Sequence, residues 1–285
     1  MTTWRVPGLP YKGRCLVMGV VNVTPDSFSD GGRWFDPDAA VRHGLQLVEQ
    51  GADIVDVGGE STRPGAARVP LDEELRRVEP VVRALAAQGV TVSVDTMRAE
   101  VAEAAVQAGA ALVNDVSGGL ADPVMPQVVA ASGVPYVVMH WRGHSHQMDA
   151  RAVYSDVLVE VAEELRKRVD SVLAEGVAEH QIIIDPGLGF AKRTEHNWAL
   201  LAGIGRLSEL GFPLLIGASR KRFLGRLLAG PDGVPRPFDE SDDASLAVTA
   251  LAAHAGAWGV RVHQVRPNAD AVRVAAAWRS GEEVR

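Results

Sequence analysis

The chain has 285 residues, 47% of them hydrophobic and 23% charged, a balance typical of a globular protein with one large domain or two small ones. Its formal net charge of −7 and its pI of about 5.6 disfavour a general nucleic-acid-binding surface, but they do not exclude a local basic pocket for an anionic substrate. Cys15 is the only cysteine, which excludes an intramolecular disulfide and indicates a buried core residue.

Membrane and targeting signals are absent from the pattern of apolar residues. No run reaches the roughly 18 apolar residues that a membrane span needs. Residues 1–12 also lack the apolar core of a signal peptide. We therefore expect a cytoplasmic protein with neither a membrane nor a nucleic acid as its partner.

Apolar runs typical of buried strands alternate along the chain with periodic stretches typical of helices. Prolines and glycines among polar residues indicate a surface arm at the N-terminus, residues 1–13. The predicted strands are 15–22, 54–58, 91–95, 111–115, 135–140, 182–184, 213–218 and 259–262. The predicted helices, each after a strand, are about 37–50, 71–88, 99–108, a short one from 122, 154–175, 194–211, 241–254 and 267–279.

These strand–helix units predict an α/β fold, a (β/α)8 TIM barrel. Eight parallel strands, each followed by a helix, close into a barrel in about 250 residues. No composition break divides the chain, so we expect a single domain at 14–279 with a tail at 280–285. A doubly wound open sheet is the competing fold, but no G-x-G-x-x-G motif follows the first predicted strand.

Polar residues follow all the predicted strands at their carboxyl ends, which share one mouth in a barrel. A single such residue could simply cap the next helix or solvate a loop, but packing does not explain a complete ring. The ring comprises Asn22, Glu60 to Arg63, Asp95, Asn114 with Asp115, His140, Asp185, Ser219 to Lys221, Arg261 and His263.

The ring combines groups suited to two kinds of ligand. Carboxylates and an amide at Asp95, Asn114 and Asp185 suit a flat heterocycle with several N–H donors. Cationic groups suit a phosphate or diphosphate; they are Arg63, Lys221, Arg261 and His263. Oxygen ligands of the kind that Mg²⁺ prefers lie at Asn22, Asp26 and Asp30.

Five segments resemble the signature motifs of the dihydropteroate synthase family. They are residues 19–32 (GVVNVTPDSFSDGG), 56–65 (DVGGESTRPG), 185–190 (DPGLGF), 217–221 (GASRK) and 261–263 (RVH). The similarity extends over residues 14–278, nearly the whole chain. The resemblance, rather than the periodicity, indicates that the heterocycle is a pterin.

The resemblance implies an alkyl (pterinylmethyl) transferase of folate synthesis, which condenses 6-hydroxymethyl-7,8-dihydropterin diphosphate with 4-aminobenzoate. It implies pterin binding by Asp95, Asn114, Asp185 and Lys221. It implies diphosphate binding by Asn22, Thr62, Arg261 and His263, with Mg²⁺ as cofactor on Asn22 and Asp30. The implied 4-aminobenzoate pocket comprises Thr62, Arg63, Pro64, Phe28, Phe190, Ser219 and Lys221, and the implied catalytic residues are Arg63, Lys221, Asp95 and Asp185.

The substrate's own aromatic amine is the nucleophile in this reaction, so no side chain needs to attack. Catalysis would neutralise the departing diphosphate and place the amine near the methylene carbon. In the family, C–O cleavage runs ahead of attack and gives a cationic pterin, which Asp95 and Asp185 would help to stabilise.

Three of these polar groups also allow other interpretations. Lys221 could form a Schiff base, but an Arg-flanked turn suits anion contact better than a desolvated amine. His144 and His146 could bind zinc, although two histidines in a polar loop are more often plain surface. Asp115 could cap a turn rather than bind a ligand.

Two alternative functions on the same barrel remain. A non-catalytic pterin-binding relative would be favoured by loss of Arg63 or Lys221, and both residues are present. A methyltetrahydrofolate-using methyltransferase would need neither residues 61–64 nor residues 219–221.

One departure from the family pattern follows His263. Gln264 stands where much of the family has Asp, and its amide could remove an acidic support for His263. The family's habit also implies a homodimer and sensitivity to sulfonamides, which are analogues of 4-aminobenzoate.

Overall fold

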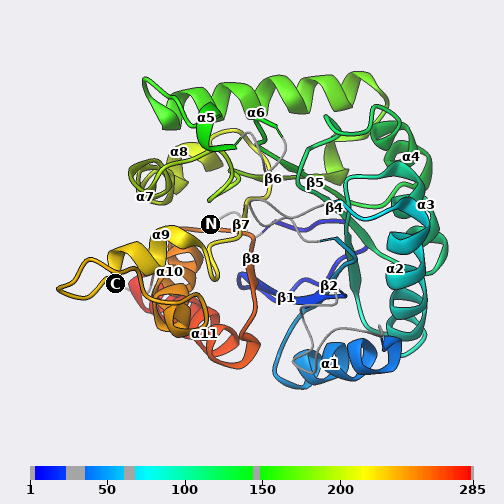
Figure 1. Ribbon diagram of the computed structural model, residues 1–285, viewed down its shortest axis with the longest axis horizontal. Helices are drawn as coiled ribbons and strands as arrows, with labels where there is room; N and C mark the ends of the chain where they lie inside the picture. Colours follow the sequence, from blue (N-terminus) through cyan, green and yellow to red (C-terminus); the bar gives the residue numbers. More distant parts are fainter. Residues whose placement is uncertain (1–3, 24–35, 61–67, 144–147, 284–285) are drawn as a thin grey trace.

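The computed structural model describes residues 4–23, 36–60, 68–143 and 148–283. Its centre is an 8-stranded parallel sheet in the order β6-β5-β4-β3-β2-β1-β8-β7. A bridge between Ile184 and Leu214 connects the two edges, so the sheet closes into a barrel with helices around it (Figure 1). The strands are β1 (Leu16–Asn22), β2 (Ile54–Gly58), β3 (Val92–Asp95), β4 (Leu112–Asp115), β5 (Tyr136–Met139), β6 (Ile182–Asp185), β7 (Leu215–Ile216) and β8 (Gly259–Val262). The predicted TIM barrel is confirmed.

Two helices of the described part of the chain begin at a capping aspartate. Asp36 accepts a hydrogen bond from the Asp38 amide at the start of α1, and Asp156 caps α6 in the same way. The helices are α1 (Pro37–Glu49), α2 (Leu71–Ala86), α3 (Ala99–Gln107), α4 (Met125–Ser132), α5 (Met148–Arg151), α6 (Val157–Ala174), α7 (Thr194–Ala202), α8 (Ile204–Ser208), α9 (Arg222–Leu227), α10 (Asp242–His254) and α11 (Val265–Glu283), with 3₁₀ turns η3 (Glu179–Gln181) and η4 (Asp239–Ser241). Within the described residues, none of these helices could cross a lipid bilayer.

Two predicted elements are wrong in their bounds. The helix predicted over 194–211 is broken into α7 and α8 at Gly203. A Cβ at Gly203 would lie 2.6 Å from the Leu158 side chain, so the glycine lets α6 pack closely at the break. The strand predicted over 213–218 retains only Leu215 and Ile216, with Leu214 in the bridge to Ile184, and Pro213 has no N–H with which to extend the ladder at its start.

The core has an outer and an inner apolar layer. The outer layer lies between strands and helices and includes the buried Cys15, as expected. The inner layer fills the lower half of the barrel and extends to the N-terminal segment through Val6, which is only 5% exposed. The expectation of a purely surface arm is therefore wrong, since Val6 closes the barrel floor.

Candidate active site

The upper half of the barrel interior is polar. Side chains two residues apart on a strand face the same side, so Asp95, Asn114 and Asp185 continue the interior rows that hold Ser93, Leu112 and Ile183 below them. All three are buried. Asp95 and Asn114 are direct neighbours across β3 and β4. The structure thus brings the three predicted pterin residues of the strands to one mouth.

Arg261 connects this group across the barrel. Its Nε donates to Oδ2 of Asp56 at 2.6 Å, and its Nη2 donates to Oδ2 of Asp95 at 2.7 Å. Asn114 donates to the same Asp56 oxygen at 3.1 Å. The Arg261 side chain is 21% exposed, so a ligand in the mouth can reach it. Its guanidinium, predicted to bind diphosphate, therefore lies against two carboxylates.

Asp56 is a site residue that the sequence reasoning did not assign. It is fully buried, and its Oδ1 has no hydrogen-bond partner among the described residues. The available signal was a carboxylate in the middle of the apolar run 54–58, where an interior strand position otherwise holds an apolar side chain. A buried charge of this kind requires a partner, and Arg261 supplies it.

The carboxylate pair changes the electrostatics of the mouth. Burial raises the pKa of Asp95 to about 7, the Arg261 charge opposes the rise, and Asp56 adds to it. The two carboxylates in turn raise the pKa of Arg261 against the effect of burial. The guanidinium therefore stays charged, and a ligand that donates N–H groups favours the ionised form of Asp95.

Asp185 is held by the turn that follows β6. Its Oδ1 accepts the Gly187 amide at 2.7 Å, and Gly187 has φ +67. A Cβ at Gly187 would lie 2.3 Å from the His140 carbonyl oxygen, so the turn requires glycine. Burial raises the pKa of Asp185, while the Gly187 hydrogen bond and the nearby cations lower it.

Lys221 and Phe190 form one wall of the mouth. The Lys221 ammonium lies over the Phe190 ring, 4.1 Å from its centroid. Phe190 belongs to a small apolar cluster with Val116, Met139 and Ala191. An apolar wall beside buried carboxylates suits a flat heterocycle with a polar edge.

The surroundings of Lys221 differ from the sequence interpretation. Packing around its ammonium lowers the pKa of Lys221 to about 8, although part of the side chain is accessible. The ammonium is therefore partly desolvated, and its expected anion contact stays a prediction. Gly189 makes room for it, because a Cβ there would lie 2.9 Å from Lys221 Cδ.

Ser219 and His263 meet between β7 and β8. The Ser219 hydroxyl lies 3.0 Å from His263 Nδ1 and accepts the His263 amide at 3.3 Å. Gln264 instead donates to Oδ2 of Asp242 at 2.7 Å, beside the ion pair of Arg220 with that carboxylate. The Gln264 side chain is therefore directed to α10, and the loss of an acidic support for His263 stays a prediction.

Three ring members serve the scaffold. Asp115 accepts the amides of Ser117 and Gly119, so its capping role is confirmed. Glu60 forms an ion pair with Arg98 at 3.0 Å. His140 does not face the mouth, because its Nε2 lies 2.9 Å from Glu164 on α6 and its Nδ1 lies 2.9 Å from Lys192 Nζ.

Several predicted site residues lie outside the described residues. They are Asp26, Phe28 and Asp30 within residues 24–35, Thr62, Arg63 and Pro64 within residues 61–67, and the histidines at 144 and 146. Asn22 ends β1 at the mouth, is partly buried, and forms no hydrogen bond with another described side chain. Across the described ranges, no cluster of three or more His, Cys, Asp or Glu could hold a metal.

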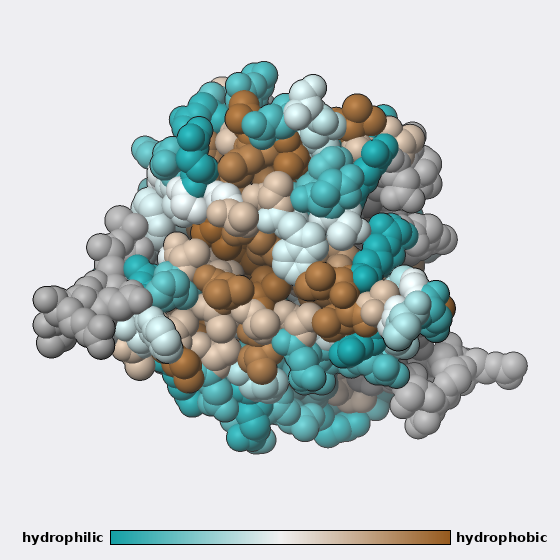
Figure 2. Space-filling model, turned by 90° about the vertical axis from the view of Figure 1, so that its left-hand side faces the viewer, coloured by the Kyte–Doolittle hydropathy of each residue, from teal (hydrophilic) through white to brown (hydrophobic). Residues whose placement is uncertain are grey.

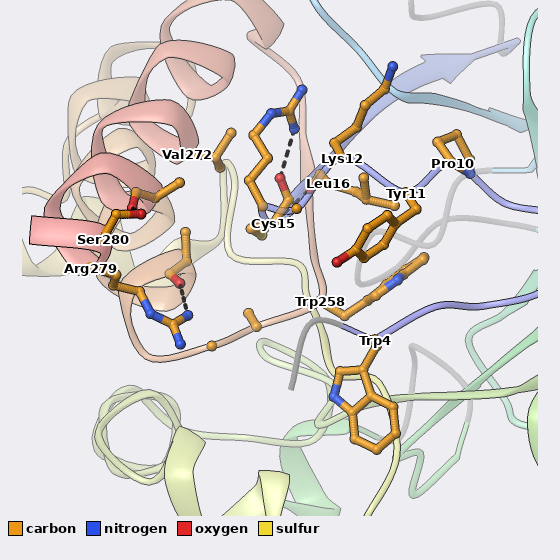
Figure 3. A pocket seen from close by; sticks show the side chains of 16 residues that line it. Trp4, Pro10, Tyr11, Lys12, Cys15, Leu16, Trp258, Val272, Arg279 and Ser280 are labelled. Carbon is orange, nitrogen blue, oxygen red and sulfur yellow. Dashed lines mark hydrogen bonds between the residues drawn. The ribbon is translucent and has the colours of Figure 1, made fainter. Parts of the chain in front are cut away.

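A pocket at the opposite end of the barrel contains none of the predicted site residues. It lies between the N-terminal segment and α10 and α11, and Trp4, Tyr11 and Trp258 border it (Figure 3). The Arg14 guanidinium beside it is already bound to Asp53 and to the Cys15 carbonyl. Leu16 and Trp258 mark the amino ends of β1 and β8, whereas barrel enzymes act at the carboxyl ends.

Comparisons with known proteins agree with this geometry. The family model described as pterin binding enzyme matches residues 18–263. A dihydropteroate synthase of Mycobacterium leprae (strain TN) is 59% identical over 263 residues, which cover 92% of this chain and 93% of the relative.

Two solved structures are similar to this chain over nearly its whole length. Xanthomonas albilineans dihydropteroate synthase with 4-aminobenzoic acid has a TM-score of 0.84 at 47% identity, covering 94% of this chain and 93% of that one. Yersinia pestis dihydropteroate synthase in a sulfonamide drug complex has a TM-score of 0.88 at 38% identity, covering 98% and 99%. The chain belongs to the pterin-binding enzymes and, within them, to the dihydropteroate synthase family.

Proposed function

We propose that the barrel mouth joins 6-hydroxymethyl-7,8-dihydropterin diphosphate to 4-aminobenzoate. The arylamine nitrogen forms a bond to the pterin methylene carbon, and the C–O bond to the diphosphate breaks. The products are 7,8-dihydropteroate, diphosphate and the proton lost by the amine. The observation that carries this proposal is the convergence of buried Asp95, Asn114 and Asp185 beside the apolar wall of Phe190.

The strand carboxylates recognise the pterin edge. Asp185 accepts two N–H groups side by side, and Asp95 and Asn114 bind the opposite side of the ring. The Lys221 ammonium lies 4.1 Å from the centroid of the Phe190 ring. From this wall of the mouth, Lys221 contacts the pterin ring. As C–O cleavage leaves positive charge on the pterin, the two carboxylates stabilise it.

The diphosphate lies on the β8 side of the mouth. Arg261 holds Asp56 and Asp95 through Nε and Nη2, which leaves Nη1 to donate to a phosphate oxygen. His263 and Asn22 flank it, and Thr62 completes the set. Asn22 offers an amide oxygen at the mouth, and with Asp30 it would hold Mg²⁺, which prefers few protein ligands together with substrate phosphates. Bound there, the metal would neutralise charge on the leaving diphosphate.

The 4-aminobenzoate occupies the outer part of the mouth. Phe190, Ser219 and Lys221 form its described border, and Thr62, Arg63, Pro64 and Phe28 are proposed to complete it. Arg63 and Lys221 would direct its carboxylate and so aim the amine at the methylene carbon. Sulfonamides would compete for the same place.

A direct assay tests the function. Pure protein is incubated with both substrates and Mg²⁺, and diphosphate release and dihydropteroate are measured. Release that requires 4-aminobenzoate is expected; its absence would favour a non-catalytic pterin-binding relative. Asp185→Asn should weaken pterin binding at least tenfold, by about 1.5–3 kcal/mol, because an amide presents a donor where an acceptor is required. Wild-type affinity in that variant would contradict the recognition role.

We also propose a homodimer that uses α10 and α11. Leu251, Val274 and Trp278 are 68%, 62% and 66% exposed on these helices. Val274 and Trp278 are four residues apart and share one helix face. Figure 2 shows this side of the barrel, with apolar side chains gathered at its middle. A cytoplasmic location stays a prediction.

A further inference from the structure

Lys192 lies behind the turn that carries Asp185. Its Nζ donates to the Phe190 carbonyl at 3.0 Å and lies 2.9 Å from His140 Nδ1. A Cβ at Gly187 would lie 3.4 Å from Nζ, which places the ammonium directly beneath the turn. Within the described part of the chain, it forms no ion pair with a carboxylate. The mechanism above does not use this lysine.

A chain of hydrogen bonds fixes the position of this ammonium. His140 Nε2 is 2.9 Å from Glu164, which also accepts from Arg142. The His140 amide donates to the Asp185 carbonyl at 2.8 Å. Burial lowers the pKa of His140 to about 4, so its ring is neutral at pH 7. With Nε2–H directed to Glu164, the Nδ1 lone pair accepts from Lys192.

Asp185 has cations nearby but no direct ion pair among the described residues. It is 7% exposed, and its one recorded side-chain hydrogen bond is the Gly187 amide. Arg261 is already paired with Asp56 and Asp95. Lys221 faces Phe190 and the ligand space. Lys192 is the described cation that acts on Asp185 from behind without a competing ion pair.

We propose that Lys192 is a positioning residue of the pterin site: held beneath the Asp185 turn by His140 and Phe190, it adds positive charge behind Asp185, alongside Lys221, and so favours the carboxylate form of Asp185. The inference rests on the proposed function, in which that carboxylate accepts two pterin N–H groups. A protonated Asp185 would present a donor to one of them.

The charge of Lys192 changes near neutral pH. The packing around its ammonium lowers the pKa of Lys192 to about 7, and Asp185 opposes that effect. Lys192 is therefore a cation below pH 7 and neutral at pH 9. The charged or titratable groups around this pair are Lys221, Arg261, His140, Arg142, Glu164, His196, Asp95 and Asp56.

The test follows the Asp185 carboxyl itself in the full chain. Aspartate carboxyl carbons are labelled with ¹³C, the Asp185 signal is assigned by its loss in Asp185→Asn, and its titration is recorded. In Lys192→Met the midpoint should rise by about one pH unit, because a nearby cation is removed. Lys192→Arg should restore it. Lys167→Met, which removes an exposed lysine of α6, should leave it unchanged.

Pterin affinity supplies the second readout, with 6-hydroxymethyl-7,8-dihydropterin as the probe. Lys192→Met should bind more weakly than wild type at pH 6, by up to about tenfold, the limit that a one-unit rise of the Asp185 midpoint sets when the pH lies below both midpoints. At pH 9 the two proteins should bind alike, since wild-type Lys192 is then neutral. Lys192→Gln, which keeps a donor for the Phe190 carbonyl, serves as a second neutral variant in case the methionine prevents folding.

An unshifted Asp185 midpoint in both neutral variants would overturn the inference. Equal loss of affinity at pH 6 and pH 9 would also overturn it, because it would assign Lys192 a purely structural role. These failures differ from failure of the proposed function, in which wild-type protein neither binds the pterin nor releases diphosphate.

Discussion

Arg261 on β8 donates a hydrogen bond from Nη2 to the Asp95 carboxylate on β3, 2.7 Å away across the barrel. The same guanidinium binds Asp56 on β2 through Nε. One guanidinium thus pairs with two buried carboxylates, which lie on the neighbouring strands β2 and β3 and face the barrel interior.

Arg261→Met should destabilise the fold strongly. The substitution leaves Asp56 and Asp95 buried without their shared cation, and breaking such a pair costs about 3–5 kcal/mol. Urea unfolding measures the change in the free energy of unfolding. Arg273→Met is the matched control, because it breaks an exposed pair with Asp270 and should cost no more than about 1 kcal/mol. Equal losses in both variants would contradict a buried network.

The barrel could be predicted because its signals are local. Apolar runs that end in polar residues mark strands, and capping residues such as Asp36 mark helix starts. The break at Gly203 could not be predicted, since it depends on the Leu158 side chain of another helix. Burial of Val6 beneath the barrel likewise depends on contacts between distant segments.

The site was predictable where a side chain follows its strand. Asp95, Asn114 and Asp185 lie together as their positions indicate. Asp56 was missed because its partner, Arg261, is 205 residues away in sequence. Lys192 was missed because nothing in a glycine-rich loop signals which way a lysine turns.

Gly189→Ala should lower the free energy of unfolding and, as a separate effect, weaken substrate binding. Gly189 has φ +79, where alanine costs about 1–2 kcal/mol, and the new Cβ would meet Lys221 Cδ at 2.9 Å. Displacement of Lys221 should raise the KM for the pterin diphosphate about tenfold or more. Steady-state kinetics and urea unfolding measure the two effects separately.

Gly211→Ala provides the control for that experiment. Gly211 has φ +85, and no atom lies within 4 Å of an added Cβ. The two alanine variants therefore share the backbone strain, and only Gly189→Ala also displaces Lys221. Comparable stability loss with unchanged KM values is expected. If Gly211→Ala raised KM as much as Gly189→Ala, the contact with Lys221 would not be the cause.

His140 should make the fold less stable as the solution is acidified. Burial lowers its pKa from 6.5 to about 4, so the folded state binds fewer protons than the unfolded state between these values. Its contribution is complete above pH 6.5 and is lost as the pH falls towards 4, by roughly 3 kcal/mol. Urea unfolding at pH 7.5 and pH 4.5 measures it.

His140→Gln isolates this effect, because Asp95 and Asp185, whose pKa values burial raises, remain in both proteins. The stability advantage of wild type should shrink or reverse at the lower pH. His180→Gln, at an exposed histidine of η3, should show the wild-type profile. A pH dependence of His140→Gln identical to that of wild type would contradict a buried neutral imidazole.

Exposed apolar residues on α10 and α11 predict the dimer interface. Arg279 on α11 donates to the Ala253 carbonyl on α10, and Leu251 and Val274 are exposed on these two helices. A stable interface of about 1,200–2,000 Å² tolerates no unpaired charge at its centre. Leu251→Glu combined with Val274→Glu should therefore give monomers in analytical ultracentrifugation. Val159→Glu, an exposed valine of α6, should stay dimeric. A wild-type protein that is monomeric at all concentrations would contradict the dimer. A double variant that still dimerises would place the interface elsewhere.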